Sequence, residues 1–521
     1  MALKVTKIKD YIVQVSGKYN FILNEIVRFP NQTRGIVMRA NEQNADIALF
    51  DVSIVQPIEV GDICKPTGRE FEIEFTEQIM GNIINIDGQV MSDHRPKVRS
   101  SAKVRRPIFR IARPIYARDF VNQPLITGLA AVDWAIPIGR GQRELILGDR
   151  QTGKTSIALN AMVAQKGSDT KVIYVAIGQK KTSVLDVYRK LEQGGVLENS
   201  VIVSASAETV ATKKWLAPFV AATIAEYLQE TYGDDVLIVY DDLSKHADAY
   251  RELALLIRSA PAREAYPGDI FYLHSKLLER AGRFNENFGG GSITALPIVQ
   301  TEAGDITSYI PTNVISITDG QIFTSKTLFN SGQRPAIDVP FSVSRVGSAA
   351  QTKALASVSS GLKLTISQYE ETRKLARLTG GAQGQNATIL EKGRVLTALL
   401  IQPELDVLFY ETGTLLLTLY KQGYLNFFET THEIVFIKKL LNTYMENDFL
   451  GRHIRKMIST SEVKPAFSEL VNREIVLPML KYFLIMQYPH IRKNDRFVEL
   501  YRDIRDDGRI YKNVARNLGG K

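Results

Sequence analysis

Eight consecutive residues have the types and spacing of a phosphate-binding loop. The segment Gly148-Asp149-Arg150-Gln151-Thr152-Gly153-Lys154-Thr155 matches the pattern G-x-x-x-x-G-K-[S/T]. Its two glycines let the backbone curl so that successive N–H groups point at phosphate oxygens. Lys154 would neutralise the β- and γ-phosphates, and the Thr155 hydroxyl would ligate Mg²⁺. An apolar strand before the loop and a helical run after it disfavour a chance glycine turn, so we expect ATP or ADP with Mg²⁺ here.

A phosphate-binding loop of this kind works together with a carboxylate at the end of a buried strand, which forms the second half of the nucleotide site. The apolar run 236–240 is followed directly by Asp241 and Asp242. Asp241 would hold the Mg²⁺ shell through water. Carboxylates at strand ends also cap helices, so this motif carries weight only together with the loop.

These residues need a sheet to position them. Between about 125 and 319, near-continuous Val, Ile and Leu runs alternate with helical segments; the runs are 144–147, 172–177, 201–203, 236–240 and 314–317. Such runs are buried on both faces, as in a parallel sheet. Their alternation with helices predicts βαβ units and an open α/β domain.

The flanking regions predict two further domains, so the fold class is a multidomain α/β chain. Residues 1–75 read as short strands of a small β-barrel or sandwich, and residues 76–352 as the P-loop domain. The basic stretch 92–107 reads as an extended loop. Residues 353–521 predict a helical bundle with apolar residues at helical spacing in 362–379, 389–402, 405–421 and 434–444, and an extended basic tail over about 488–521.

Composition limits the class of protein further. The chain has 521 residues, a net charge of +9 and one cysteine, Cys64, which cannot form an internal disulfide and fits a reducing compartment. Neither a signal peptide nor a run of ~20 apolar residues is present, so we expect membrane contact only through partners. His246 and His274 lack the spacing of metal ligands and read as packing or surface residues.

Five long segments together identify a family. Residues 139–155, 240–245, 263–269, 309–321 and 342–351 closely resemble the alpha subunits of F-type ATP synthases. The resemblance implies an N-terminal β-barrel, a central RecA-like domain and a C-terminal helical domain. It also implies an alternating hetero-hexamer with catalytic beta-type subunits around a gamma-type central shaft. By the same resemblance, the complex is cytoplasmic, lies at the inner face of the cell membrane as a peripheral assembly, and is coupled to ATP synthesis and proton transport.

Within that resemblance, one substitution predicts a site that does not turn over its nucleotide. Catalytic beta subunits carry a Glu that activates the attacking water, and the matching residue here is Gln179. An amide cannot act as a general base, although it can orient water. The chain would contribute to catalysis in trans instead, through Arg345, which matches the arginine finger lent to the neighbouring beta site.

Two further residues match positions of the family's nucleotide site. Arg334 matches a position near the phosphates of the chain's own site. Gln402 matches one of two glutamines near the adenine, and Glu404 stands in place of the other, so the resemblance does not extend base recognition to Glu404.

Departures from the family leave alternatives open. Barrel-like sequence starts near Tyr11, so the usual N-terminal stalk-docking extension looks missing. The last 31 residues carry nine Lys and Arg against five Asp and Glu, a net +4 out of +9. These departures keep open an F-like ATPase with another output, such as the motility motors of mycoplasmas. A Rho-type nucleic-acid motor would also explain the basic charge, but it needs the Glu that Gln179 replaces, and we expect no nucleic-acid partner.

Overall fold

A computed structural model describes residues 3–447 except 53–54, 97, 380–383, 424, 427 and 429, together with residues 452 and 455. The predicted basic tail lies outside the described residues. The chain divides into two compact units. The first contains residues 1–122, 139–326 and 343–346, and the second contains 123–138, 327–342 and 347–521.

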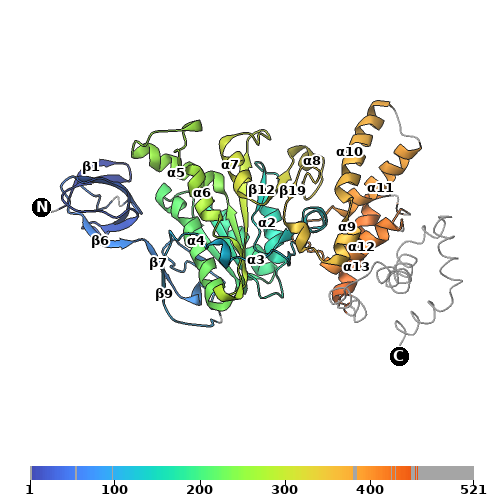
Figure 1. Ribbon diagram of the computed structural model, residues 1–521, viewed down its shortest axis with the longest axis horizontal. Helices are drawn as coiled ribbons and strands as arrows, with labels where there is room; N and C mark the ends of the chain where they lie inside the picture. The colour runs from blue at the N-terminus through green and yellow to red at the C-terminus, as the bar shows by residue number, and fades with distance from the viewer. Residues whose placement is uncertain are drawn as a thin grey trace. The chain divides into compact units, whose positions relative to one another are not determined.

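The N-terminal part of the first unit is a six-stranded antiparallel sheet in the order β1-β2-β5-β4-β3-β6 (Figure 1). The strands are β1 (Lys4–Lys9), β2 (Ile12–Ser16), β3 (Glu25–Arg28), β4 (Arg34–Ala40), β5 (Asn44–Leu49) and β6 (Lys65–Glu70). Backbone hydrogen bonds join Val5 in β1 to Gly61 and Asp62, each at 2.9 Å. That contact links the first strand to the stretch before the last one, while closure into a barrel stays a prediction.

The central sheet has nine strands, with the path β19-β18-β12-β17-β15-β13-β14-β8 and β16 paired to β17. They are β8 (Ile83–Ile84), β12 (Glu144–Asp149), β13 (Lys171–Ile177), β14 (Ser200–Ala205), β15 (Asp235–Asp241), β16 (Gly282–Arg283), β17 (Ser292–Thr301), β18 (Gly320–Thr324) and β19 (Val343–Ser344). All pairings are parallel except those of β16 and β19. The predicted, mostly parallel sheet is therefore confirmed.

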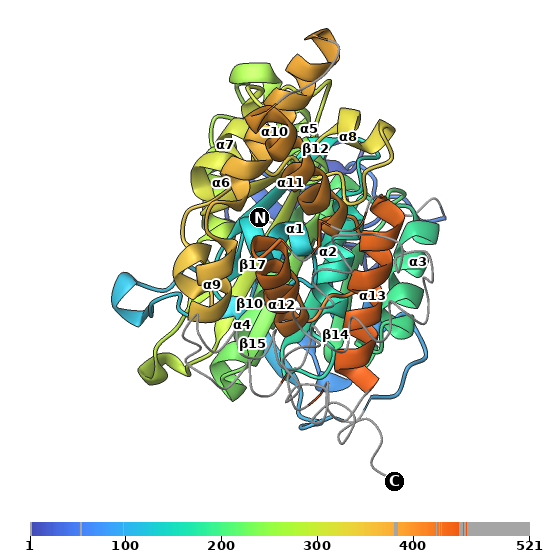
Figure 2. The ribbon, with the colours of Figure 1, turned by 90° about the vertical axis from the view of Figure 1, so that its right-hand side faces the viewer.

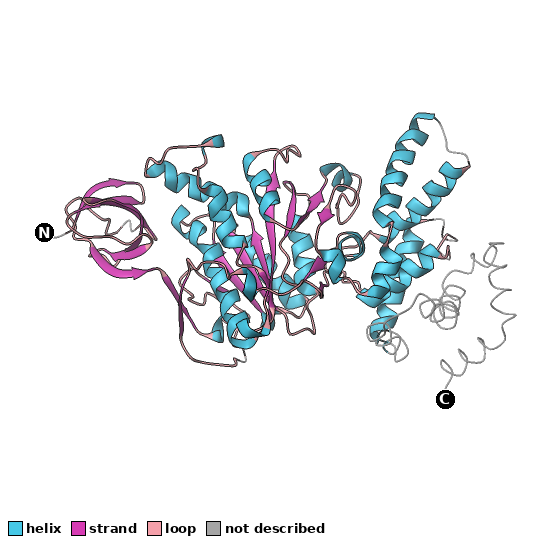
Figure 3. Cartoon of the chain, viewed as in Figure 1, coloured by secondary structure: helices cyan, strands magenta, loops and turns pink. Residues whose placement is uncertain are grey.

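Helices cover both sides of this sheet (Figure 3). They are α2 (Lys154–Val163), α3 (Lys181–Gln193), α4 (Ala211–Tyr232), α5 (Leu243–Leu256), α6 (Ile270–Leu278) and α7 (Tyr309–Ile317). The shorter strands β7 (Glu72–Phe75) and β9 (Val104–Pro107) pair with each other, so the stretch 92–107 is not wholly a loop as predicted.

One predicted strand is wrong. Residues 314–317 form the end of α7, and the strand follows three residues later as β18. A four-residue apolar run does not distinguish a buried strand from a buried helix segment. Pro311 lies in the first turn of α7, where its missing N–H costs no helical hydrogen bond.

The second unit is dominated by helices, which confirms the predicted C-terminal helical region (Figure 2). They are α1 (Ala130–Ala135), α9 (Lys353–Ser359), α10 (Leu362–Thr379), α11 (Gln385–Leu399), α12 (Tyr410–Lys421) and α13 (Thr431–Asn447). The short strand β10 (Pro124–Leu125) also lies in this unit, while α8 (Lys326–Asn330) and β11 (Ile138–Gly139) each share one residue with the first unit. Buried Lys438 of α13 donates to the carbonyls of Leu399 and Ile401, which ties α13 to the end of α11. Within the described part of the chain, every helix is too short or too polar to span a bilayer.

His246 and His274 are packing residues of the first unit, which is one of the two predicted alternatives, and both are fully buried. Their rings lie 5.4 Å apart between centroids, and His246 Nε2 lies 3.0 Å from the Trp215 carbonyl oxygen. Burial lowers the pKa of His246 to about 4. It lowers the pKa of His274 well below its ordinary value, and the neighbouring His246 lowers it further.

We expect this pair to make the fold acid-sensitive. Below pH ~6.5 the unfolded chain binds protons at these histidines that the folded chain excludes. The contribution of the neutral pair to the free energy of unfolding is therefore fully present above that pH and is lost as the pH falls towards 4. For His246 alone the loss is about 2 kcal/mol at pH 5. His246→Gln should therefore show a smaller fall in thermal midpoint between pH 7 and pH 5 than the unsubstituted chain. His432→Gln, at an exposed site on α13, is the control; parallel curves for all three proteins would contradict the expectation.

Candidate functional site

The loop between β12 and α2 has the backbone geometry that its sequence predicts. Gly148 has φ +150°, and a Cβ there would lie 2.1 Å from Thr324 Oγ1, so only glycine fits. Gln151 and Gly153 both have left-handed φ angles, +64° and +88°. Such turns direct successive N–H groups to one side of the loop, beside the N-terminus of α2. The loop can therefore cradle an anion.

Lys154 begins α2 and is buried, with 8% of its surface exposed. Its ammonium donates to the carbonyl oxygens of Gly148 at 2.8 Å and Asp149 at 2.5 Å. Burial lowers the pKa of Lys154, while the nearby carboxylates of Asp242 and Asp241 oppose that shift. The charge thus sits inside the loop, where a phosphate group could replace the carbonyls as its partner.

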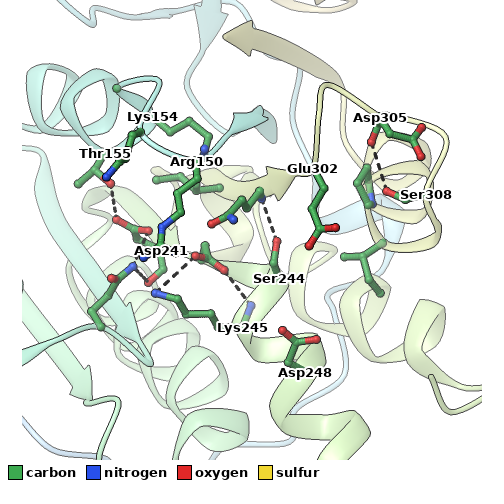
Figure 4. A pocket seen from close by; sticks show the side chains of 18 of the residues that line it. Arg150, Lys154, Thr155, Asp241, Ser244, Lys245, Asp248, Glu302, Asp305 and Ser308 are labelled. Carbon is green, nitrogen blue, oxygen red and sulfur yellow. Dashed lines mark hydrogen bonds and ion pairs between the residues drawn. The ribbon is translucent and has the colours of Figure 1, made fainter. Parts of the chain in front are cut away.

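Asp241 at the end of β15 is the centre of a hydrogen-bonded cluster (Figure 4). Its Oδ2 accepts from the Thr155 hydroxyl at 2.8 Å and from the Tyr174 hydroxyl at 2.7 Å. Its Oδ1 accepts from Gln179 Nε2 at 2.9 Å. A hydroxyl and a carboxylate side by side offer the oxygen ligands that Mg²⁺ prefers, so the donor set fits that ion. The residues predicted from two separate motifs are therefore brought together.

The cluster opens into a cavity of about 840 Å³, which is large enough for a nucleotide. Its lining includes four cationic side chains, Arg150, Lys154, Lys245 and Arg251, and six carboxylates, Asp241, Asp242, Asp248, Glu264, Glu302 and Asp305. Figure 4 shows Glu302 and Asp305 across from Lys154 and Thr155. Burial and the adjacent Asp241 raise the pKa of Asp242 to about 6, and Asp242 caps α5 by accepting from the Lys245 N–H at 2.8 Å.

Two predicted loop residues use their side chains to hold the loop. Asp149 Oδ1 accepts from the Thr301 hydroxyl and from the Gly304 N–H, both at 2.7 Å. Thr152 donates to the Asp149 carbonyl at 2.8 Å and lies 2.6 Å from the Thr324 hydroxyl. These two side chains therefore stabilise the loop and are engaged within the chain.

Arg345 follows β19 in the first unit and is exposed. Its backbone N–H donates to the Asp319 carbonyl at 3.0 Å, while its guanidinium makes a 3.3 Å contact with the Thr318 carbonyl. The described residues that line the cavity do not include it. The backbone is thus anchored and the guanidinium is accessible to a group outside this chain.

Arg334 and Gln402 belong to the second unit, where the Gln402 N–H donates to the Arg334 carbonyl at 2.7 Å. Gln402 Nε2 donates to the carbonyls of Gly128 and Asp406, and its Oε1 accepts from the Ala130 N–H. The Arg334 guanidinium lies 3.5 Å over the Phe329 ring and donates to the Phe329 carbonyl. The Arg334 side chain holds its own loop, whereas the Gln402 side chain joins its loop to the segment of Gly128 and Ala130. The predicted contact of both residues with a nucleotide stays a prediction.

Sequence reasoning missed Tyr174, Lys245 and Glu302. Lys245 lies within a segment that carried the family resemblance. Its position three residues after Asp242, on the helix that follows the strand, could have indicated that it faces the same site. Tyr174 has no motif of its own, because its contact with Asp241 depends on the register of two strands that are distant in the sequence.

The chain is similar to ATP synthase alpha/beta proteins over most of its length. The nucleotide-binding domain of the ATP synthase alpha/beta family matches residues 128–344, and the C-terminal domain of ATP synthase alpha/beta chains matches residues 351–474. ATP synthase subunit alpha of Mycoplasma mycoides subsp. mycoides is 44% identical over 481 residues, which cover 92% of this chain and 90% of that one. ATP synthase subunit alpha 1 of Mycoplasmopsis pulmonis is 48% identical over 81% of this chain and 79% of that one. ATP synthase subunit alpha 1 of Nitrosospira multiformis is 43% identical over 83% of this chain and 85% of that one.

Proposed function

Since the chain belongs to the ATP synthase alpha/beta family, we propose that it is a non-catalytic alpha-type subunit of an F-type ATP synthase that binds Mg²⁺·ATP or Mg²⁺·ADP. Its partners are catalytic beta-type subunits, with which it alternates in a hexamer, and a gamma-type shaft. The complex couples ATP chemistry to proton transport, and this subunit is peripheral to the membrane. The N-terminal sheet closes into a barrel in this proposal.

The observation that carries the proposal is the amide of Gln179 beside Asp241. Asp241 and Thr155 are the two residues expected to hold Mg²⁺, and they form the metal half of the site. Gln179 Nε2 donates to Asp241 Oδ1 at 2.9 Å and lines the cavity that contains Lys154 and Thr155. A group in that place could deprotonate an attacking water if it were a carboxylate, but an amide remains neutral. Nucleotide bound here is therefore held and not turned over.

The accessibility of Arg345 supports a catalytic contribution to the neighbouring subunit. Its backbone is fixed by the bond to Asp319, and its guanidinium is exposed outside the chain's own cavity. A planar, permanently charged group presented in this way can stabilise a transferring phosphoryl group on a partner.

We expect the full-length chain alone to bind ATP with Mg²⁺ and to hydrolyse it negligibly, because Gln179 supplies no general base. Calorimetric titration with ATP and excess Mg²⁺ measures the binding, and phosphate release from the same preparation measures turnover. Saturable binding with phosphate release no higher than in a buffer blank would support the proposal. Steady turnover by the isolated chain would contradict the holding role, and an absence of binding would contradict the nucleotide site itself.

A further inference from the structure

Tyr174 in β13 is a buried residue that the proposed function does not yet use, with 2% of its surface exposed. In the parallel register of β13 and β15, Tyr174 lies opposite Val239 and Ala176 lies opposite Asp241. Tyr174 and Asp241 are therefore diagonal neighbours on one face of the sheet. The tyrosine hydroxyl donates to Asp241 Oδ2 at 2.7 Å from that position.

The three donors to Asp241 differ in what can replace them. Thr155 and Gln179 line the cavity, so an incoming ligand can take over either contact. Tyr174 is not among the described residues that line the cavity, and its side chain is buried. It is thus the donor that stays with the carboxylate when the Thr155 hydroxyl turns towards a cation.

We propose that Tyr174 is a positioning residue for the metal half of the nucleotide site, holding Oδ2 of Asp241 so that this carboxylate faces the place where Thr155 meets Mg²⁺. The inference rests on the proposed function, because it requires that the site take Mg²⁺ with the nucleotide. Donors that orient a metal-binding carboxylate contribute about 10–100-fold to metal affinity in other sites. The loop N–H groups and Lys154 hold the phosphates without help from Tyr174, so its effect should be confined to the metal-dependent part of binding.

The chain provides a matched control in Tyr240 of β15. Tyr240 is equally buried and is the sequence neighbour of Asp241, but alternation along the strand places its side chain on the opposite face of the sheet. There it lies near Arg280 and Glu226, away from the cavity. Tyr240→Phe therefore removes a hydroxyl from the same sheet without touching the cluster.

The test titrates ATP into the full-length chain by calorimetry, once with excess Mg²⁺ and once with EDTA, for the unsubstituted chain, Tyr174→Phe and Tyr240→Phe. For Tyr174→Phe we expect about a tenfold loss of affinity with Mg²⁺ and an unchanged affinity in EDTA. Tyr240→Phe should leave both affinities unchanged. The ratio of the two affinities is taken within one variant, so a misfolded fraction lowers the stoichiometry and leaves the ratio intact.

A double substitution sharpens the result. In an Asp241→Ala background, Tyr174→Phe should cause no further loss of Mg²⁺ dependence, because the contact through which it acts is gone. The role of Tyr174 would be overturned if Tyr174→Phe left the ratio of the two affinities unchanged. It would also be overturned if Tyr174→Phe lowered the affinity with Mg²⁺ as much in the Asp241→Ala background as in the unsubstituted chain. Either result would leave the proposed function standing. An unsubstituted chain that binds no ATP under either condition would instead overturn the proposed function, and the role of Tyr174 with it.

Discussion

Replacing Arg345 by alanine is expected to lower the ATPase rate of the assembled complex by about 10³-fold or more, which is the range that arginine fingers contribute in phosphoryl transfer. The guanidinium would stabilise charge on the phosphoryl group at the neighbouring subunit's site. Arg345 is exposed, and its backbone hydrogen bond to Asp319 does not depend on its side chain. The substitution should therefore change neither the fold of this chain nor the nucleotide bound to it. Steady-state hydrolysis by the purified complex, with bound nucleotide counted separately, measures both effects.

The controls for this experiment separate charge from geometry. Arg345→Lys keeps the positive charge but loses the planar fork of donors, so we expect it to recover only a small part of the rate. Arg69→Ala removes an exposed arginine from β6, far along the chain from the motif, and should leave the rate unchanged. A complex with Arg345→Ala that hydrolyses ATP at near-native rates would refute the role in trans.

The site was predictable from the sequence wherever its residues are local. The loop, Lys154 and Thr155 occupy eight consecutive positions between a strand and a helix, so their geometry follows from the motif. Asp241 was predictable because a carboxylate after a buried strand of a parallel sheet lies at the same edge as that loop.

What the sequence did not reveal depends on contacts between distant segments. The donation from Tyr174 to Asp241 requires the register of β13 against β15. The anchoring of Asp149 requires Thr301 at the end of β17 and Gly304 of the loop that follows. Gln402 matches a position near the adenine in the family, but its side-chain amide donates to the carbonyls of Gly128 and Asp406. No local sequence pattern predicts these two hydrogen bonds. Residues 314–317 were assigned to a strand because a short apolar run has no detectable period.

Lys154→Met should nearly abolish nucleotide binding to this chain, with a loss of affinity of at least about 100-fold. Of the two described cationic residues of the loop, Lys154 is buried and Arg150 is exposed, so the Lys154 ammonium has already lost most of its water. Each charge-assisted hydrogen bond to a phosphate is worth about 1.5–3 kcal/mol, so two lost bonds correspond to roughly two to four powers of ten. Calorimetric titration with Mg²⁺·ATP measures the loss.

Lys154 also stabilises the loop itself, so its substitution removes more than a charge. Lys154 donates to the carbonyls of Gly148 and Asp149, so methionine leaves two loop carbonyls without that partner as well as removing the charge. Lys154→Arg keeps the charge but is too large for a buried position enclosed by the loop, so it should bind ATP weakly too. Lys166→Met removes an exposed lysine just beyond the other end of α2 and should bind ATP normally. If Lys154→Met and Lys166→Met bind Mg²⁺·ATP equally well, the nucleotide is held somewhere other than this loop, and the assignment of the whole site is wrong.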